Sequence, residues 1–470
     1  MGLKKLQIVF DNPWSTYYSG QPVSGRLIID VDSPKKIRAI SIQFKGEACV
    51  KWDEMKTRKT NEGNTTRETI VYTAQENYFE NKFNLVGGSG EMIIEPGEKI
   101  YPFSTHLPPN LPSSFEAEFG YVRYTVKAVL DRPWKFDQEV KSAFTVITPL
   151  DLNTHPTAKD PVKKETEKNF CCCCCKSGPL SLVMSIPVGG YVSGQIIPVT
   201  VEVDNASNVN VDNVYCALRK VVTFKATSPQ RTERKDKVTI AEQNFGSVAG
   251  GGSNTWCEQI TIPPLPPSNL NNCNIIDLEY DLRVECKVAG FYHRNLTVKT
   301  PIILGSIPLA SYQSPVPLQK PDSENNGAII PDGPPTDPSG DHHPQYGPAG
   351  HQSPGGFAQP QWGPAPPGPA VSPGGQPQNP QWGPGPNVSP SAPPPTGGAG
   401  AWVPPSGPPQ PGPPAAPGGA LYPTLPQPMF AEGTFGGAKN IRDASDNQYT
   451  QGSQEFTPRY PVYNFQPPQQ

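Results

Sequence analysis

One stretch decides the fold: Gly190-Tyr191-Val192-Ser193-Gly194-Gln195-Ile196-Ile197-Pro198-Val199-Thr200-Val201-Glu202-Val203-Asp204-Asn205. Its Ser-Gly-Gln portion is typical of a turn, and the run that follows is rich in β-branched and apolar residues, which predicts a strand. A weaker copy runs from Tyr18 to Asp32 and again sets Ser-Gly-Gln before such a run. Two copies of one pattern indicate that the chain holds two copies of one domain.

A second repeated signal supports this duplication. The proline-rich turn 107–114 is answered by another at 262–269, and each leads into a strand of alternating pattern, at 124–130 and 282–288. No amphipathic helical stretch of three turns occurs in the first 310 residues. The sequence therefore predicts an all-β protein with two tandem immunoglobulin-like β-sandwiches.

Composition sets the domain boundaries. Of the 61 prolines among 470 residues, 37 follow position 320, and a segment this rich in proline cannot bury a core. We predict an N-terminal sandwich over 1–148, a linker with a cysteine cluster over 149–177, a C-terminal sandwich over 178–310 and a disordered Pro-rich tail over 311–470.

Charge and hydropathy limit the classes of function that we expect for the chain. A net charge of −3 gives no basic surface of the kind that nucleic-acid binding needs, so we expect no nucleic-acid partner. No apolar run approaches the roughly 20 residues that span a bilayer, and no secretory signal is present, which predicts a cytoplasmic protein. None of the six histidines lies in a motif that pairs a base with a nucleophile. We predict a non-enzyme with no catalytic residue, no metal and no cofactor.

Six stretches occur in order along the first 310 residues: Leu6–Asn12, Phe119–Tyr124, Cys171–Cys175, Gly190–Asn205, Val209–Arg219 and Ile276–Tyr280. Through them, and through its two sandwiches and proline-rich tail, the chain resembles the α-arrestins, the arrestin-domain-containing proteins. The resemblance implies that both sandwiches are of the arrestin type and bind membrane receptors or transporters as cargo. It also implies that the tail recruits WW-domain HECT ubiquitin ligases, so that the cargo moves to endosomes and the protein associates peripherally with the plasma membrane and endosomes.

The ligase-binding motif of the family is Pro-Pro-x-Tyr, and this chain lacks a complete copy. The nearest sequences contain Pro344 with Tyr346 and Pro458 with Tyr460, and each lacks the first proline. A WW groove packs a polyproline turn and then the tyrosine ring, so the missing proline removes contact area worth about 1 kcal/mol or more. Two such sites on one chain can recover affinity through effective concentration.

Two other short sequences in the tail match ligands of the endosomal sorting (ESCRT) machinery. In both, prolines hold the backbone extended while apolar side chains fill pockets. A tail of this composition also produces such sequences by chance, and its Pro-x-x-Pro sequences fit a rival function as a scaffold for SH3 or WW proteins. The ESCRT-ligand-like residues are Pro390, Ser391, Ala392 and Pro393, and Leu421, Tyr422, Pro423 and Leu425.

Five adjacent cysteines stand at the junction of the sandwiches. Zinc sites take spaced pairs of ligands, and neighbouring cysteines are poorly placed for disulfides, so two interpretations remain. The cysteines are sites of reversible palmitoylation beside nearby lysines, or they are small apolar residues that open the second sandwich. The candidate residues are Cys171, Cys172, Cys173, Cys174 and Cys175.

Lys4 and Lys5 stand where related arrestins use paired lysines to contact receptor phosphates. The alternative is that they form a solvated edge of the first strand. A last rival function is redox regulation, because a family member that resembles this chain binds thioredoxin. No activated cysteine is evident in the sequence to support it.

Overall fold

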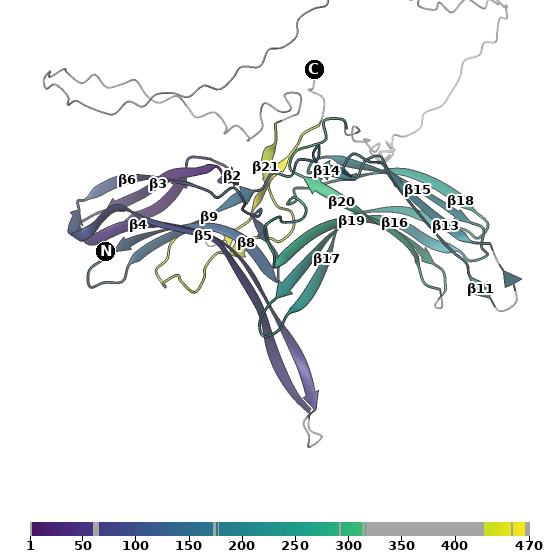
Figure 1. Cartoon of the computed structure of the whole chain (residues 1–470), viewed down its shortest axis with the longest axis horizontal. Coiled ribbons are helices and arrows are strands. Elements are labelled where there is room, and N and C mark those ends of the chain that lie inside the picture. Colours follow the sequence, from purple (N-terminus) through teal and green to yellow (C-terminus); the bar gives the residue numbers. More distant parts are fainter. Residues whose placement is uncertain are drawn as a thin grey trace, which may run out of the picture. The chain divides into compact units, whose positions relative to one another are not determined.

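The computed structural model describes residues 2–59, 65–172, 175–176, 178–290, 293–312, 315, 427–452 and 455–465. All of them belong to one compact unit, which comprises Met1–Lys320 and Pro411–Gln470. Every regular element in the described ranges is a strand, so the all-β prediction is confirmed (Figure 1). Within the same ranges, no helix is long and apolar enough to cross a membrane.

The N-terminal sandwich pairs a three-stranded sheet with a larger one. The smaller sheet has the order β1 (Lys5–Phe10), β3 (Pro22–Val31) and β6 (Gly97–His106). The larger has the order β2 (Thr16–Tyr18), β9 (Gln138–Ile147), β8 (Gly120–Asp131), β4 (Lys35–Lys59) and β5 (Thr65–Ile94), and β7 (Phe115–Glu116) pairs with β8. In the larger sheet, β4 and β5 continue past the end of β8 as a two-stranded hairpin (Figure 1).

The C-terminal sandwich repeats this plan with a four-stranded and a five-stranded sheet. Its strands alternate between buried and more exposed side chains, as at Leu180–Ile186, where every second residue is buried. The first sheet has the order β10 (Val162–Lys168), β13 (Leu180–Ile186), β15 (Ile196–Asn205) and β18 (Ser253–Thr261). The second has the order β14 (Gly190–Val192), β20 (Leu296–Gly305), β19 (Ile276–Val288), β16 (Val211–Ala226) and β17 (Thr232–Val248).

The two Ser-Gly-Gln stretches form the same structure. In each, the glutamine side-chain oxygen accepts a hydrogen bond of 2.9 Å from a backbone N–H three residues earlier, Tyr18 for Gln21 and Val192 for Gln195. The glycine of each turn has a positive φ, 82° at Gly20 and 91° at Gly194, which residues with a side chain rarely adopt. The repeated sequence therefore encodes one turn that joins the two sheets of a sandwich.

The two proline-rich turns are also equivalent. Tyr124 Oη donates a hydrogen bond to Pro112 O at 2.6 Å, and Tyr280 Oη donates one to Pro266 O at 2.9 Å. Both tyrosines are fully buried, and each fixes the turn to the strand that follows it in the chain. Both repeated sequence signals therefore correspond to one repeated domain.

Two segments differ from the sequence-based expectation. Val162–Lys168, expected in a linker, forms β10 and pairs with β13 along its whole length, because its charged side chains suit an exposed edge strand. Residues 427–465 fall in the region predicted to be disordered. Their described part forms two strand pairs, β21 (Met429–Glu432) with β24 (Arg459–Val462) and β22 (Lys439–Asn440) with β23 (Glu455–Phe456).

Candidate functional site

The candidate site is built around two lysines on neighbouring strands of the N-terminal sandwich. Lys127 of β8 and Lys141 of β9 are direct cross-strand partners. The Lys141 N–H points away from β8, so this pair is of the non-hydrogen-bonded kind, in which side chains lie closest. Only 8% of Lys127 and 4% of Lys141 is exposed. Two like charges buried opposite each other are destabilising unless anions neutralise them. We call Lys127 and Lys141 the lysine pair.

Most of the carboxylates that neutralise the lysine pair come from the C-terminal part of the sequence. Asp446 bridges the lysine pair, with Oδ1 3.2 Å from Lys127 Nζ and Oδ2 2.9 Å from Lys141 Nζ. Asp443 Oδ2 lies 2.7 Å from Lys141 Nζ, and Glu139 of the sandwich lies 3.1 Å from Lys127 Nζ. Among the described residues, both carboxylates that pair with Lys141 therefore belong to residues 427–452 and 455–465, which we call the C-terminal segment.

A tight turn presents these two carboxylates. The Asp443 carboxylate accepts hydrogen bonds from the backbone N–H and the hydroxyl of Ser445, and the backbone N–H of Asp446 donates to Asp443 O. Partial burial raises the pKa of Asp443, but the hydrogen bonds from Lys141 and Ser445 outweigh it and lower the pKa to about 2. The turn thus directs two carboxylates, three residues apart, at the lysine pair.

The C-terminal segment also binds the edge of β9. Gln451 N–H donates to Glu139 O at 2.8 Å, and Lys141 N–H donates to Gln451 O at 2.9 Å. The Thr450 hydroxyl donates to the Glu139 carboxylate at 2.6 Å. Gly452 has a positive φ, and a side chain there would meet the carbonyl of Lys141. A peptide that joins a free strand edge in this way gains affinity from backbone hydrogen bonds.

Two further contacts lie on either side of the lysine pair. The buried Arg123 makes a two-bond salt bridge to Glu116, at 2.7 and 2.8 Å, and its third donor reaches Asn440 O at 3.1 Å. Next to Gln451, Tyr449 packs on Phe136 with ring centroids 5.7 Å apart. The segment therefore follows the sheet from β7 to the β8–β9 connection.

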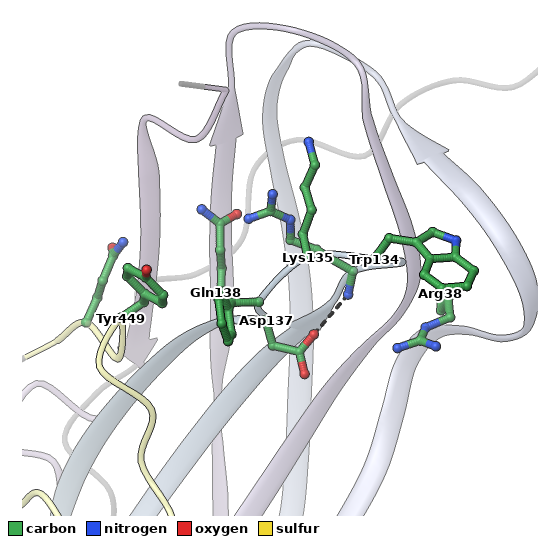
Figure 2. Close-up of a pocket in the computed structure, with 9 residues that line it drawn as sticks. Arg38, Trp134, Lys135, Asp137, Gln138 and Tyr449 are labelled. Atoms are coloured by element: carbon green, nitrogen blue, oxygen red, sulfur yellow. Dashed lines mark hydrogen bonds between the residues drawn. The ribbon is translucent and has the colours of Figure 1, made fainter.

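The Phe136 contact belongs to a groove at the β8–β9 connection. Figure 2 shows Trp134 and Lys135 projecting from this connection, while Tyr449 comes from the C-terminal segment. The connection is held by the Arg132 N–H, which donates to the Asp137 carboxylate at 3.0 Å. Because Tyr449 and Gln451 form one wall, this groove depends on the docked segment.

The predicted WW-ligand-like residues Pro458 and Tyr460 lie in the same segment and are buried. Tyr460 is 2% exposed and packs with Tyr18, Ile147 and Phe430. Its hydroxyl donates to Ser114 O at 3.1 Å. Pro458 O accepts a hydrogen bond from the Gly433 N–H. In this conformation, the tyrosine ring is not available to a WW groove.

The segment ends against the C-terminal sandwich. Tyr463 N–H donates to Ser193 O at 3.0 Å, and its hydroxyl donates to Ser306 O at 2.7 Å. A Cβ atom at Gly194 would meet the Tyr463 carbonyl, so the glycine of the repeated turn also makes room for the segment. The C-terminal segment therefore contacts both sandwiches.

The other predicted site residues are not brought to the lysine pair. Lys4 is exposed and Lys5 lies 3.7 Å from Glu98, both at the edge of the three-stranded sheet. Cys171–Cys172 pairs with Cys175–Lys176 as a short hairpin of β11 and β12, and Cys173 and Cys174 lie outside the described residues. Pro344, Tyr346 and both ESCRT-ligand-like sequences, 390–393 and 421–425, also lie outside them.

Sequence reasoning missed the lysine pair and its aspartates. The sequence predicted an alternating strand at 124–130, but the structure buries both faces of β8 at 122–128, where the C-terminal segment contacts Arg123 and Lys127. One signal could have shown this coverage. The prolines that fill the tail are absent between Pro428 and Pro458, where the acidic turn lies.

Comparisons with known proteins agree with this fold. Residues 6–153 match the family described as arrestin (or S-antigen), N-terminal domain, and residues 176–309 match its C-terminal domain. Arrestin domain-containing protein 17 of Caenorhabditis elegans is 34% identical over 347 residues, which cover 71% of this chain and 78% of that protein. Arrestin domain-containing protein 4 of Homo sapiens is 31% identical over 318 residues, 66% of this chain and 73% of that one.

Arrestin domain-containing protein 1 of Rattus norvegicus is 30% identical over 323 residues, which cover 68% of each chain. Two consecutive arrestin sandwiches define the class of protein: an arrestin-fold adaptor without enzymatic activity. The chain belongs to the arrestin domain-containing proteins, the α-arrestin family.

Proposed function

We propose that this chain is a cytoplasmic adaptor for membrane-protein trafficking, which couples receptor or transporter cargo to ubiquitin ligases and endosomal sorting proteins. The observation that carries the proposal is the combination of two arrestin domains with a tail that contains sequences similar to short peptide ligands. In this scheme the sandwiches bind cargo and the tail binds the machinery.

Ligase recruitment is tested with isolated peptides. Labelled peptides around Tyr346 and Tyr460, each with a Tyr→Ala control, are titrated with the WW domains of a HECT ligase by fluorescence anisotropy. We expect tyrosine-dependent dissociation constants of tens of micromolar or better, roughly −6 kcal/mol or stronger. Binding that does not depend on the tyrosines would remove ligases from the proposal.

Endosomal sorting is tested in cell extract with the full chain. We propose that 390–393 and 421–425 bind ESCRT components through extended proline-containing backbones. The Pro393→Ala, Tyr422→Ala double variant should lose these components in a pull-down. Equal recovery with the variant and the wild type would exclude both sequences as ligands.

Membrane attachment and cargo contact are separate parts of the proposal. We propose palmitoylation of Cys171–Cys175, where Lys168 and Lys176 supply a second, electrostatic signal. Acyl-exchange labelling should fall when the five cysteines become serine. We also propose that Lys4 and Lys5 contact cargo phosphates, so a Lys4→Ala, Lys5→Ala variant should bind a phosphorylated cargo tail more weakly.

A further inference from the structure

The β8–β9 connection exposes two large aromatic side chains that the sandwich does not bury. Trp134 is 99% exposed and Phe136 is 71% exposed. Trp134 also has a φ of 60°, a backbone conformation that residues with a bulky side chain rarely adopt. A tryptophan that is both strained and exposed does nothing for the stability of the sandwich. Such a residue points to contact with a partner.

The aromatic surface has a third member, which comes from the C-terminal segment. Tyr449 is 49% exposed and packs on Phe136. The hydrogen bond from the Arg132 N–H to the Asp137 carboxylate closes the connection that carries Trp134 and Phe136. Trp134 projects from this connection, away from the strands (Figure 2). We call Trp134, Phe136 and Tyr449 the aromatic tip.

Positive side chains surround the aromatic tip. The groove beside it is lined by the three cations Arg38, Arg132 and Lys135 and by one carboxylate, that of Asp137. Arg38 pairs with Asp131 at the surface. Within the ranges that the structure describes, Arg132 and Lys135 make no salt bridge. These two charges are therefore free to pair with anions outside the chain.

A further lysine lies at the same end of the sheet. Lys35 begins β4, and its Nζ donates to Gln138 Oε1 at 3.3 Å, where β9 starts. Burial and the positive charges of Arg132 and Lys135 lower the pKa of Lys35, and the opposing effect of Asp32 is smaller. This end of the sheet therefore carries a positive potential that an anionic surface would neutralise.

Aromatic rings among cations match the surface of a bilayer that contains anionic lipids. Tryptophan and tyrosine favour the boundary between headgroups and acyl chains, because each ring has an apolar body and a polar end. Lysine and arginine beside the bilayer gain from the negative surface potential of anionic lipids. The aromatic tip and its neighbouring cations supply both contributions within one connection and the strand ends next to it.

We propose that the aromatic tip, together with Arg38, Arg132 and Lys135, binds the surface of a membrane that contains anionic phospholipids. The rings enter the boundary between headgroups and acyl chains, and the cations contact the lipid phosphates. The inference deepens the membrane association of the proposed function and rests on that function for the presence of a membrane. It requires neither acylation of the cysteines nor cargo.

The first test measures sedimentation of full-length chains with vesicles. Cys171–Cys175 are replaced by serine in every chain, so that no acyl chain contributes. Vesicles of phosphatidylcholine with phosphatidylserine should bind the chain about tenfold or more tightly than vesicles of phosphatidylcholine alone. Trp134→Ala with Phe136→Ala should weaken binding to the anionic vesicles by about tenfold or more. Arg132→Gln with Lys135→Gln should weaken it by about fivefold for each charge.

Two matched controls belong to this test. Ile100→Ala removes a side chain that is 54% exposed on β6, in the smaller sheet, and should bind the anionic vesicles like the unsubstituted chain. Arg132→Lys with Lys135→Arg keeps both charges and should also bind like it. Equal binding by the Trp134→Ala, Phe136→Ala variant would overturn the proposal, as would an unsubstituted chain that binds neither kind of vesicle.

Entry of the Trp134 ring into the bilayer is measured by tryptophan fluorescence. Anionic vesicles that contain phosphatidylcholine with brominated acyl chains should quench the emission of the chain on binding. The chain has seven tryptophans, so the contribution of Trp134 is the difference from a Trp134→Phe variant, which keeps an aromatic ring. Quenching should be smaller in this variant. Equal quenching in both chains would mean that the ring stays outside the bilayer, and would overturn the proposal.

These outcomes are distinguishable from failure of the proposed function. If vesicle binding depends on the aromatic tip but acyl-exchange labelling does not depend on Cys171–Cys175, palmitoylation fails and the tip stands. If labelling depends on the cysteines but the Trp134→Ala, Phe136→Ala variant binds vesicles normally, the tip is wrong and attachment rests on the acyl chains. A chain that ignores vesicles but needs Trp134 to capture a protein would assign the surface to that protein and overturn the membrane assignment.

Discussion

At the scale of single residues, Asp443 gives the docked segment its dependence on pH. Its folded pKa of about 2 lies below the ordinary value of 3.8, so its contribution is present above pH 4 and is lost as the pH falls towards 2. Because the side chain is partly exposed, we expect a contribution of only about 1 kcal/mol to docking. Asp443→Asn should weaken protection of the Lys141 amide at pH 7, and the difference from wild type should vanish between pH 4 and 2. A difference from wild type that persists at pH 2 would contradict this pH dependence.

Two substitutions at Tyr460 separate the contribution of its hydrogen bond to docking from the contribution of its packing. Tyr460→Phe removes the bond to Ser114 O and should weaken docking by about 1 kcal/mol. Tyr460→Ala also empties the site between Tyr18 and Ile147 and should cost about 3 kcal/mol or more. The effect of both substitutions is measured by hydrogen exchange of the Gly433 amide, which donates a hydrogen bond to Pro458 O. If the alanine variant is as protected as wild type, the ring does not hold the segment.

At the scale of elements, substitutions at two neighbouring glycines distinguish the cost of a steric contact from the cost of backbone strain. Gly436 and Gly437 both have positive φ, at 120° and 62°. A side chain at Gly436 would meet the carbonyl of Glu116, whereas nothing lies within 4 Å of one at Gly437. We expect Gly436→Ala to release the segment and to speed tryptic cleavage after Arg442 several-fold, through a contact cost of about 1–3 kcal/mol. Similar cleavage in Gly437→Ala would assign the effect to backbone strain alone.

Elements could be predicted from the sequence where their causes are local. The turns at Gly20 and Gly194 were recognised because one glycine and one glutamine determine each of them within four residues. The C-terminal segment could not be recognised in this way, because its partners lie far away in the sequence. Asp446, for example, lies 319 positions from Lys127. Its composition was also averaged with that of the proline-rich tail, which hid the proline-free residues 429–457. Local pattern predicts strands and turns, but it does not say which strand edge a distant segment joins.

At the scale of the whole molecule, the C-terminal segment contacts both sandwiches, at Lys127 and Lys141 in the first and at Ser193 and Ser306 in the second. The Lys127→Gln, Lys141→Gln chain loses the charges that bind Asp443 and Asp446, so we expect its segment to dock more weakly on both sandwiches. Hydrogen exchange of the Tyr463 amide, which donates to Ser193 O, should then be about tenfold faster than in wild type. Equal protection of this amide in the two chains would mean that the end of the segment near Tyr463 stays docked without the contacts at the lysine pair.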